Sequence, residues 1–163
     1  MIRTLTLAGA LAGAVSLSQF PEFSQQYLQR LSGAVDELRG LVLAFDATAG
    51  AAGLTRDEAL ADLSGSAFQT DLQATLAGQI TRYERLSQDY TALRTAEPLG
   101  RLAQLYRFAD PDLARRTWDD FRPAVPASPD GLMFAGIGFA GGWMLLAAAF
   151  GLLRRLFRGA AAA

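Results

Sequence analysis

The sequence predicts an all-α membrane protein in which two transmembrane helices flank an extracytoplasmic helical hairpin or bundle. Near each end of the 163-residue chain lies a long apolar segment without charge, and between these two segments apolar residues recur every three or four positions. No stretch alternates polar and apolar residues as a strand would. The expected segments are a first span at 1–21, a helical domain at 22–128, a second span at 129–157 and a tail at 158–163.

The first apolar segment has 17 residues without charge, from Thr4 to Phe20, and follows Arg3. We interpret it as a retained span that starts in the cytoplasm. The alternative is a cleaved signal peptide, because residues 12–14, Ala-Gly-Ala, resemble a cleavage site. The apolar residues that continue after Ala14 favour retention.

The first long helix of the central domain is predicted by a stripe of apolar residues between Phe23 and Phe45. Pro21 suits its first turn, and Gly50 with Gly53 suits its end. The first span is expected to run into this helix with a kink at Pro21.

Further helix starts are indicated by capping residues or prolines, at Thr55, Ser66, Pro98 and Asp110. The helix after Ser66 should be long, because apolar residues recur from Phe68 to Leu93. The expected architecture is therefore two long amphipathic helices packed antiparallel, with short helices closing the bundle. The stripes of the two helices could also bind a partner helix or lie on the bilayer surface.

The second apolar segment is the stronger membrane signal. Residues 131–153 carry no charge, and at about 1.5 Å per residue they are long enough to cross a hydrocarbon core of roughly 30 Å. Ser128 and Pro129 suit an N-cap and a first turn. A buried core helix is the alternative, but such a helix rarely lacks a polar face. Three arginines follow and are expected at cytoplasmic headgroups: Arg154, Arg155 and Arg158.

The charge distribution predicts the topology. All 16 carboxylates and 11 of the 15 basic residues lie between Glu22 and Asp130, and the remaining arginines lie at the two ends. Both termini are therefore expected in the cytoplasm, and the acidic central domain in the periplasm. Aromatic residues at the expected membrane exits suit an interfacial belt: Phe20, Phe23, Tyr27, Trp118 and Phe121.

Residues 19–31 read QFPEFSQQYLQRL, residues 34–37 read AVDE, and residues 121–126 read FRPAVP. These segments resemble the opening and closing signatures of domain-of-unknown-function family 2937. The resemblance implies a bacterial inner-membrane protein and supplies no catalytic residues. Gln29 and Arg30, in the first turns above the membrane, are expected either to bind headgroups or a partner, or simply to order the start of the helix.

The composition argues against enzyme classes. The chain has no His, Cys or Lys, so it lacks the residues of the usual catalytic triads, zinc sites and phosphate-binding loops. We therefore expect no enzymatic activity and no cofactor. The net charge of −1 means that the chain has no excess of basic residues of the kind that indicates nucleic-acid binding. No ionisable group lies within either span, which argues against a proton relay.

Small residues in the two spans favour close helix packing. Gly9 and Gly13 are four residues apart, as are Gly138 and Gly142, and this spacing lets helices approach closely. The two spans are expected to cross at these glycines, within one subunit or between subunits; the alternative is that Gly and Ala are simply abundant. Trp143 would pack opposite a glycine or contact a lipid, a pigment or a partner span.

The leading functional hypothesis is a non-enzymatic accessory or scaffold protein of the bacterial inner membrane. It would act by self-association or by docking onto a larger membrane complex, with membrane lipids as its other partners. One alternative is an oligomeric pore or carrier, for which few polar residues are available. Another is a membrane-tethered periplasmic module that holds a lipid or apolar ligand between the two long helices.

Overall fold

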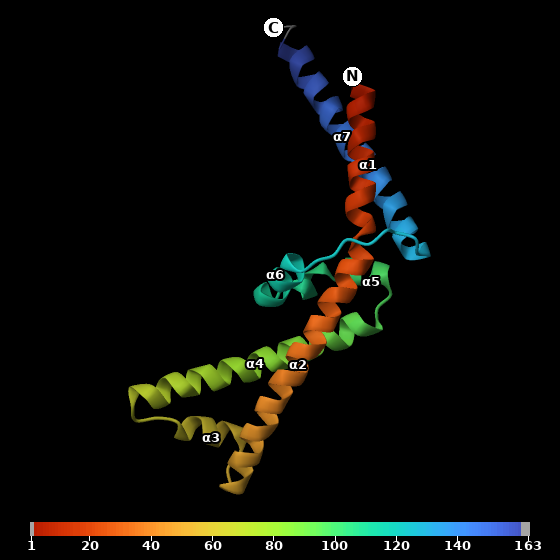
Figure 1. The fold of residues 1–163 in the computed structure, drawn as a ribbon. Coiled ribbons are helices and arrows are strands. Elements are labelled where there is room, and N and C mark those ends of the chain that lie inside the picture. Colours follow the sequence, from red (N-terminus) through yellow and green to blue (C-terminus); the bar gives the residue numbers. More distant parts are fainter. Residues whose placement is uncertain (1, 161–163) are drawn as a thin grey trace. The chain divides into compact units, whose positions relative to one another are not determined.

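The computed structural model describes residues 2–160, and the side chains of residues 2–154. Every regular element in this part of the chain is a helix, so the prediction of an all-α fold is confirmed (Figure 1). The helices are α1 (Ile2–Ser18), α2 (Phe20–Ala51), α3 (Arg56–Asp62), α4 (Ala67–Thr95), α5 (Pro98–Ala103), the 3-10 helix η1 (Leu105–Phe108), α6 (Pro111–Asp119) and α7 (Pro129–Ala160).

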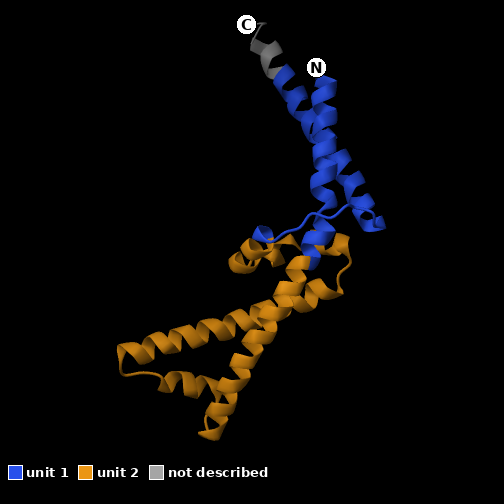
Figure 2. Cartoon of the chain, in the orientation of Figure 1, with its two compact units in different colours: residues 1–25, 118–163 blue, residues 26–117 orange. Residues whose placement is uncertain are grey.

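The chain forms two compact units, which are coloured separately in Figure 2. Unit 1 consists of residues 1–25 and 118–163, and unit 2 of residues 26–117. The boundaries fall inside α2 and near the end of α6. Unit 1 therefore joins the two ends of the chain.

Within unit 1, α7 has the length and composition of a membrane-crossing helix. Its apolar part, Pro129–Arg154, has 26 residues and a mean hydropathy of 1.8. In the described part of the chain it is the one helix that meets both criteria. The sequence predicted a second such helix at the N-terminus, but α1 has only 17 residues.

The break between α1 and α2 lies at Gln19, two residues before the expected kink at Pro21. Proline has no backbone N–H, and its ring clashes with the carbonyl four residues earlier, so α1 cannot continue through it. The Phe23 amide donates to the Gln19 carbonyl at 2.9 Å, which makes Gln19 the first acceptor of the new helix. Pro21 then lies in the first turn of α2, as predicted.

Unit 2 has its core where α2 passes α4. Four side chains of these helices are fully buried there: Tyr27, Leu31, Leu86 and Leu93. Figure 1 shows the two helices running in roughly opposite directions and diverging beyond this point, with α3 between their far ends. They do not pack along their whole length as the sequence suggested. Phe68, at the far end of the expected α4 stripe, is 76% exposed.

The helix ends of unit 2 follow the predicted signals. After α2, Gly53 has φ +74°, its amide donates to Gly50, and the Leu54 amide donates to Ala49, as in a Schellman motif. Thr55 and Glu58 form the expected reciprocal capping box at α3. The Ser66 hydroxyl accepts from the Gln69 amide and caps α4.

Candidate functional site

Helices α1 and α7 cross with their backbones in direct contact. A Cβ atom added to Gly13 would overlap the Gly138 carbonyl and lie 3.3 Å from the Gly142 Cα atom. A Cβ atom added to Gly9 would overlap Leu146 and lie 3.7 Å from the Gly142 carbonyl oxygen. The crossing therefore leaves no room for a side chain at Gly13, where the backbone of α7 is in the way, whereas at Gly9 the Leu146 side chain would have to move.

The structure brings the four predicted packing glycines together at this one crossing, within a single chain. Residues four apart share a helix face, so each pair presents a flat strip of backbone to the other helix. Gly136 and Gly141 of α7 differ, because a Cβ atom on either would meet nothing within 4 Å, and the close contacts of a Cβ atom on Gly131 are with Pro126 and Ser128 and not with α1. The close approach is thus specific to the predicted pairs and is not a general effect of glycine content.

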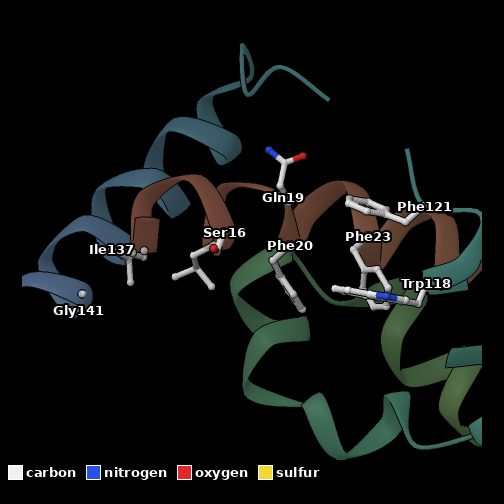
Figure 3. Close-up of a pocket in the computed structure, with 12 residues that line it drawn as sticks. Ser16, Gln19, Phe20, Phe23, Trp118, Phe121, Ile137 and Gly141 are labelled. Atoms are coloured by element: carbon white, nitrogen blue, oxygen red, sulfur yellow. The ribbon is translucent and has the colours of Figure 1, made fainter. Parts of the chain in front are cut away.

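Beside the crossing lies a groove of about 670 Å³, which we call the aromatic groove. Figure 3 shows the rings of Phe23, Phe121 and Trp118 gathered at one end and Ile137 with Gly141 at the other. The lining is almost wholly apolar and comes from α1, the start of α2, the end of α6 and α7: Gly13, Ser16, Leu17, Gln19, Phe20, Phe23, Trp118, Phe121, Ile137, Gly138, Gly141 and Gly142. Such a lining suits an acyl chain, another apolar ligand or an apolar helix.

Aromatic contacts fix one end of the groove. Phe23 meets Phe121 and Trp118 edge-on, with ring centroids 5.8 and 6.4 Å apart. Phe20 stacks on the fully buried Phe134 of α7 at 5.5 Å. Trp118 is 73% exposed, so it offers a large apolar face at the mouth.

The Gln19 side chain holds the proline-rich segment that leads into α7. Its Nε2 donates to the Ala124 carbonyl at 3.1 Å, and its Oε1 accepts from the Ala124 amide at 3.0 Å. This pair of bonds joins two positions that are 105 residues apart in the sequence. It attaches the start of α2 to the segment before the last helix.

A second cleft of about 490 Å³ lies nearer the N-terminus of α1 and the C-terminus of α7. We call it the arginine cleft, because Arg3 and Arg154 both line it. Trp143, which the sequence associated with the glycines, lies here and is 51% exposed. The remaining lining residues are Ile2, Thr6, Leu7, Ala147, Phe150 and Gly151.

The residues expected at the membrane interface divide between several environments. Phe20, Phe23 and Trp118 line the aromatic groove, and Arg154 lines the arginine cleft. Gln29 is exposed, and Arg30 is half-buried. Arg155 and Arg158 belong to the helical end of α7, but their side chains lie outside the described part of the structure.

Tyr27 lies elsewhere than the sequence suggested. Its side chain is fully buried in the core of unit 2, where its ring centroid is 4.7 Å from that of Phe108. Burial and the nearby Asp110 carboxylate raise the pKa of the Tyr27 phenol to about 12. Tyr27 therefore supports the core and does not form part of a lipid-facing belt. The position of Tyr27 in the apolar stripe predicted between Phe23 and Phe45 was the better indication of this burial.

A buried carboxylate organises the charged part of unit 2. Asp110 is 2% exposed and accepts hydrogen bonds from Arg82 at 3.0 and 3.2 Å and from Arg85 at 2.9 Å. It also accepts from the Leu113 amide at 3.2 Å, which caps α6. Burial raises the pKa of Asp110, but these hydrogen bonds outweigh burial and leave it below its ordinary value of 3.8.

Sequence reasoning identified some of these residues by the wrong role and missed others. Asp110 was expected to start a helix, which it does, but its ion pairs with Arg82 and Arg85 of α4 were not anticipated. The hydrogen bonds of Gln19 to Ala124 and the contact of Phe20 with Phe134 were not anticipated. The sequence did contain a signal for Gln19, because its amide side chain stands between a charge-free segment and Pro21.

These features define a class: an all-α protein whose first and last helices cross at glycines and carry an aromatic groove, with a separate helical unit between them. The chain belongs to the family described as "Protein of unknown function (DUF2937)", whose model matches residues 1–159. The family resemblance seen in the sequence is therefore confirmed. No curated protein and no solved structure matches the chain.

Proposed function

We propose that this protein is a non-enzymatic scaffold of the bacterial inner membrane, in which α1 and α7 together form a two-span anchor and unit 2 is periplasmic. The observation that most supports this proposal is the apolar surface of α1 and α7. Although α1 and α7 bury their glycine strips against each other, they leave most of their large apolar side chains exposed. In water such a surface would drive association, whereas lipid is a suitable solvent for it.

Several features support two spans over one. At about 1.5 Å per residue, α1 reaches roughly 26 Å, close to the thickness of a hydrocarbon core. It contains no charged residue after Arg3. It contacts α7 along a strip of backbone, and small residues at that spacing are typical of helix pairs in membranes.

The aromatic groove supports a docking role. It is apolar, it opens beside the anchor, and a Cβ atom built on the lining residue Gly141 would meet nothing within 4 Å. A transmembrane helix of a second copy or of a larger complex would fill it. A bound lipid or pigment is the second candidate occupant, which would make the protein an apolar-ligand carrier.

Topology is tested by single cysteines in this naturally cysteine-free chain. Thr95→Cys in unit 2 should react with a membrane-impermeant maleimide added outside spheroplasts. Thr4→Cys should react only after the membrane is permeabilised. Labelling of Thr4→Cys from outside would contradict the proposed orientation.

Docking is tested by a matched pair of substitutions on α7. Both Gly136 and Gly141 face open space, but only Gly141 lines the groove. Gly141→Leu should therefore release a partner from protein purified out of native membranes, while Gly136→Leu should not. Native mass spectrometry shows whether the released partner is a protein or a small apolar molecule. A wild-type particle of 17.4 kDa with no companion would contradict the scaffold proposal.

A further inference from the structure

The arginine cleft places two cations beside apolar surface. Arg3 from α1 and Arg154 from α7 both line it. The sequence has no Asp or Glu before Glu22 or after Asp130, so α1 carries no carboxylate side chain and α7 carries only Asp130, in its first turn and far along the helix from Arg154. Two guanidinium groups at one cleft repel each other, and an anion held between them removes that repulsion.

The rest of the cleft is apolar and open. Trp143 is half-exposed, and Phe150 and Leu7 also line the cleft. Among the described side chains, a Cβ atom on the lining residue Gly151 would meet nothing within 4 Å. The cleft's hydroxyl group, Thr6 Oγ1, donates to the Ile2 carbonyl at 2.9 Å within α1 and is 5% exposed as a residue. The two guanidinium groups therefore remain as the charged groups that can meet a ligand, beside the indole N–H of Trp143.

We propose that this cleft binds an anionic membrane phospholipid. The phosphate lies between Arg3 and Arg154, and an acyl chain lies along Trp143 and Phe150. The inference rests on the proposed two-span anchor, in which this end faces the cytoplasmic leaflet. A free phosphate ion would use the arginines alone and leave the aromatic lining in water. A headgroup with net negative charge suits two cations better than a zwitterionic one does.

The test uses the full chain in mild detergent, with lipid binding read by native mass spectrometry. Wild-type protein should retain phosphatidylglycerol over phosphatidylcholine by about twenty-five-fold, because each arginine favours an anionic headgroup by roughly fivefold. The double variant Arg3→Gln with Arg154→Gln should lose this selectivity. The matched control, Arg39→Gln with Arg116→Gln, removes the same charge from exposed positions of unit 2 and should keep it.

A further variant separates a lipid site from a simple anion site. Trp143→Ala should weaken phosphatidylglycerol binding several-fold while the preference over phosphatidylcholine persists. Inorganic phosphate at millimolar concentration should not displace the lipid. Displacement by phosphate, with no effect of Trp143→Ala, would show an anion site only and overturn the proposal.

A failure of the lipid-binding proposal can be distinguished from a failure of the proposed membrane anchor. Extraction of membranes with alkaline carbonate reports whether wild-type protein is integral. If the protein is integral and the double arginine variant keeps full lipid selectivity, the cleft assignment is wrong and the anchor stands. If carbonate releases wild-type protein, the anchor itself is wrong.

Discussion

Asp110 illustrates how one residue joins elements that are distant in sequence. Its carboxylate binds two arginines of α4 and also caps α6. The cap was predictable from the Asp-Pro pair, because capping is local. The ion pairs were not, because they depend on how α4 and α6 pack.

Asp110→Asn should destabilise unit 2 by about 2 kcal/mol, because it removes the charge that two arginines bind in a buried position. Asn is also a good capping residue, so the cap of α6 is retained and the loss reports the ion pairs. The measurement is urea unfolding of the full chain followed by circular dichroism.

Asp112→Asn is the control for this experiment. Its side chain is 72% exposed and lies 3.8 Å from Arg82, so its loss should cost less than about 1 kcal/mol. Equal effects of the two substitutions would contradict the role given to Asp110.

At the scale of elements, the crossing of α1 and α7 depends on backbone contact. Gly138→Ala should weaken it by about 1–3 kcal/mol, because the new methyl group would meet the Gly13 carbonyl and Leu17 Cβ, the latter at 2.8 Å. Gly136→Ala is the matched control and should be neutral or slightly stabilising, since alanine favours helix more than glycine does. Thermal unfolding in detergent, followed by tryptophan fluorescence, measures both. A lower midpoint for both variants would remove the special role of Gly138.

The elements also show how far the sequence could predict the fold. Helices with local signals were predictable, such as α3 from its capping box and α7 from Ser128 and Pro129, whose cap is present. The divergence of α2 and α4 was not, because periodicity identifies an apolar face without giving the angle at which two faces meet. For the same reason, the sequence predicted that the four glycines pack together, but it did not predict the aromatic groove or the arginine cleft.

At the scale of the whole molecule, the two units differ in their carboxylates. Unit 2 contains Asp110, Asp46 and Glu58, whose pKa values are all lowered by hydrogen bonds to folded partners. A carboxyl with a lowered pKa stabilises the folded state above its ordinary pKa, and the benefit is lost as the pH falls through the lowered value. The crossing of α1 and α7 contains no carboxylate.

Acid should therefore unfold unit 2 before it affects the α1–α7 crossing. All four tyrosines lie in unit 2, and both tryptophans lie in unit 1. Between pH 7 and pH 2 the near-ultraviolet dichroism of tyrosine should be lost while the emission of tryptophan is preserved. Simultaneous loss of both signals would contradict this order.

The pairing of the first helix with the last has a consequence for biosynthesis. A ribosome adds about 5–20 residues per second, so the glycine strip of α1 is made on the order of ten seconds before its complement in α7. During that interval the nascent first helix must rest against something other than its final neighbour. In the proposed two-span anchor, lipid or the membrane-insertion machinery would cover Gly9 and Gly13 until translation reaches Gly142.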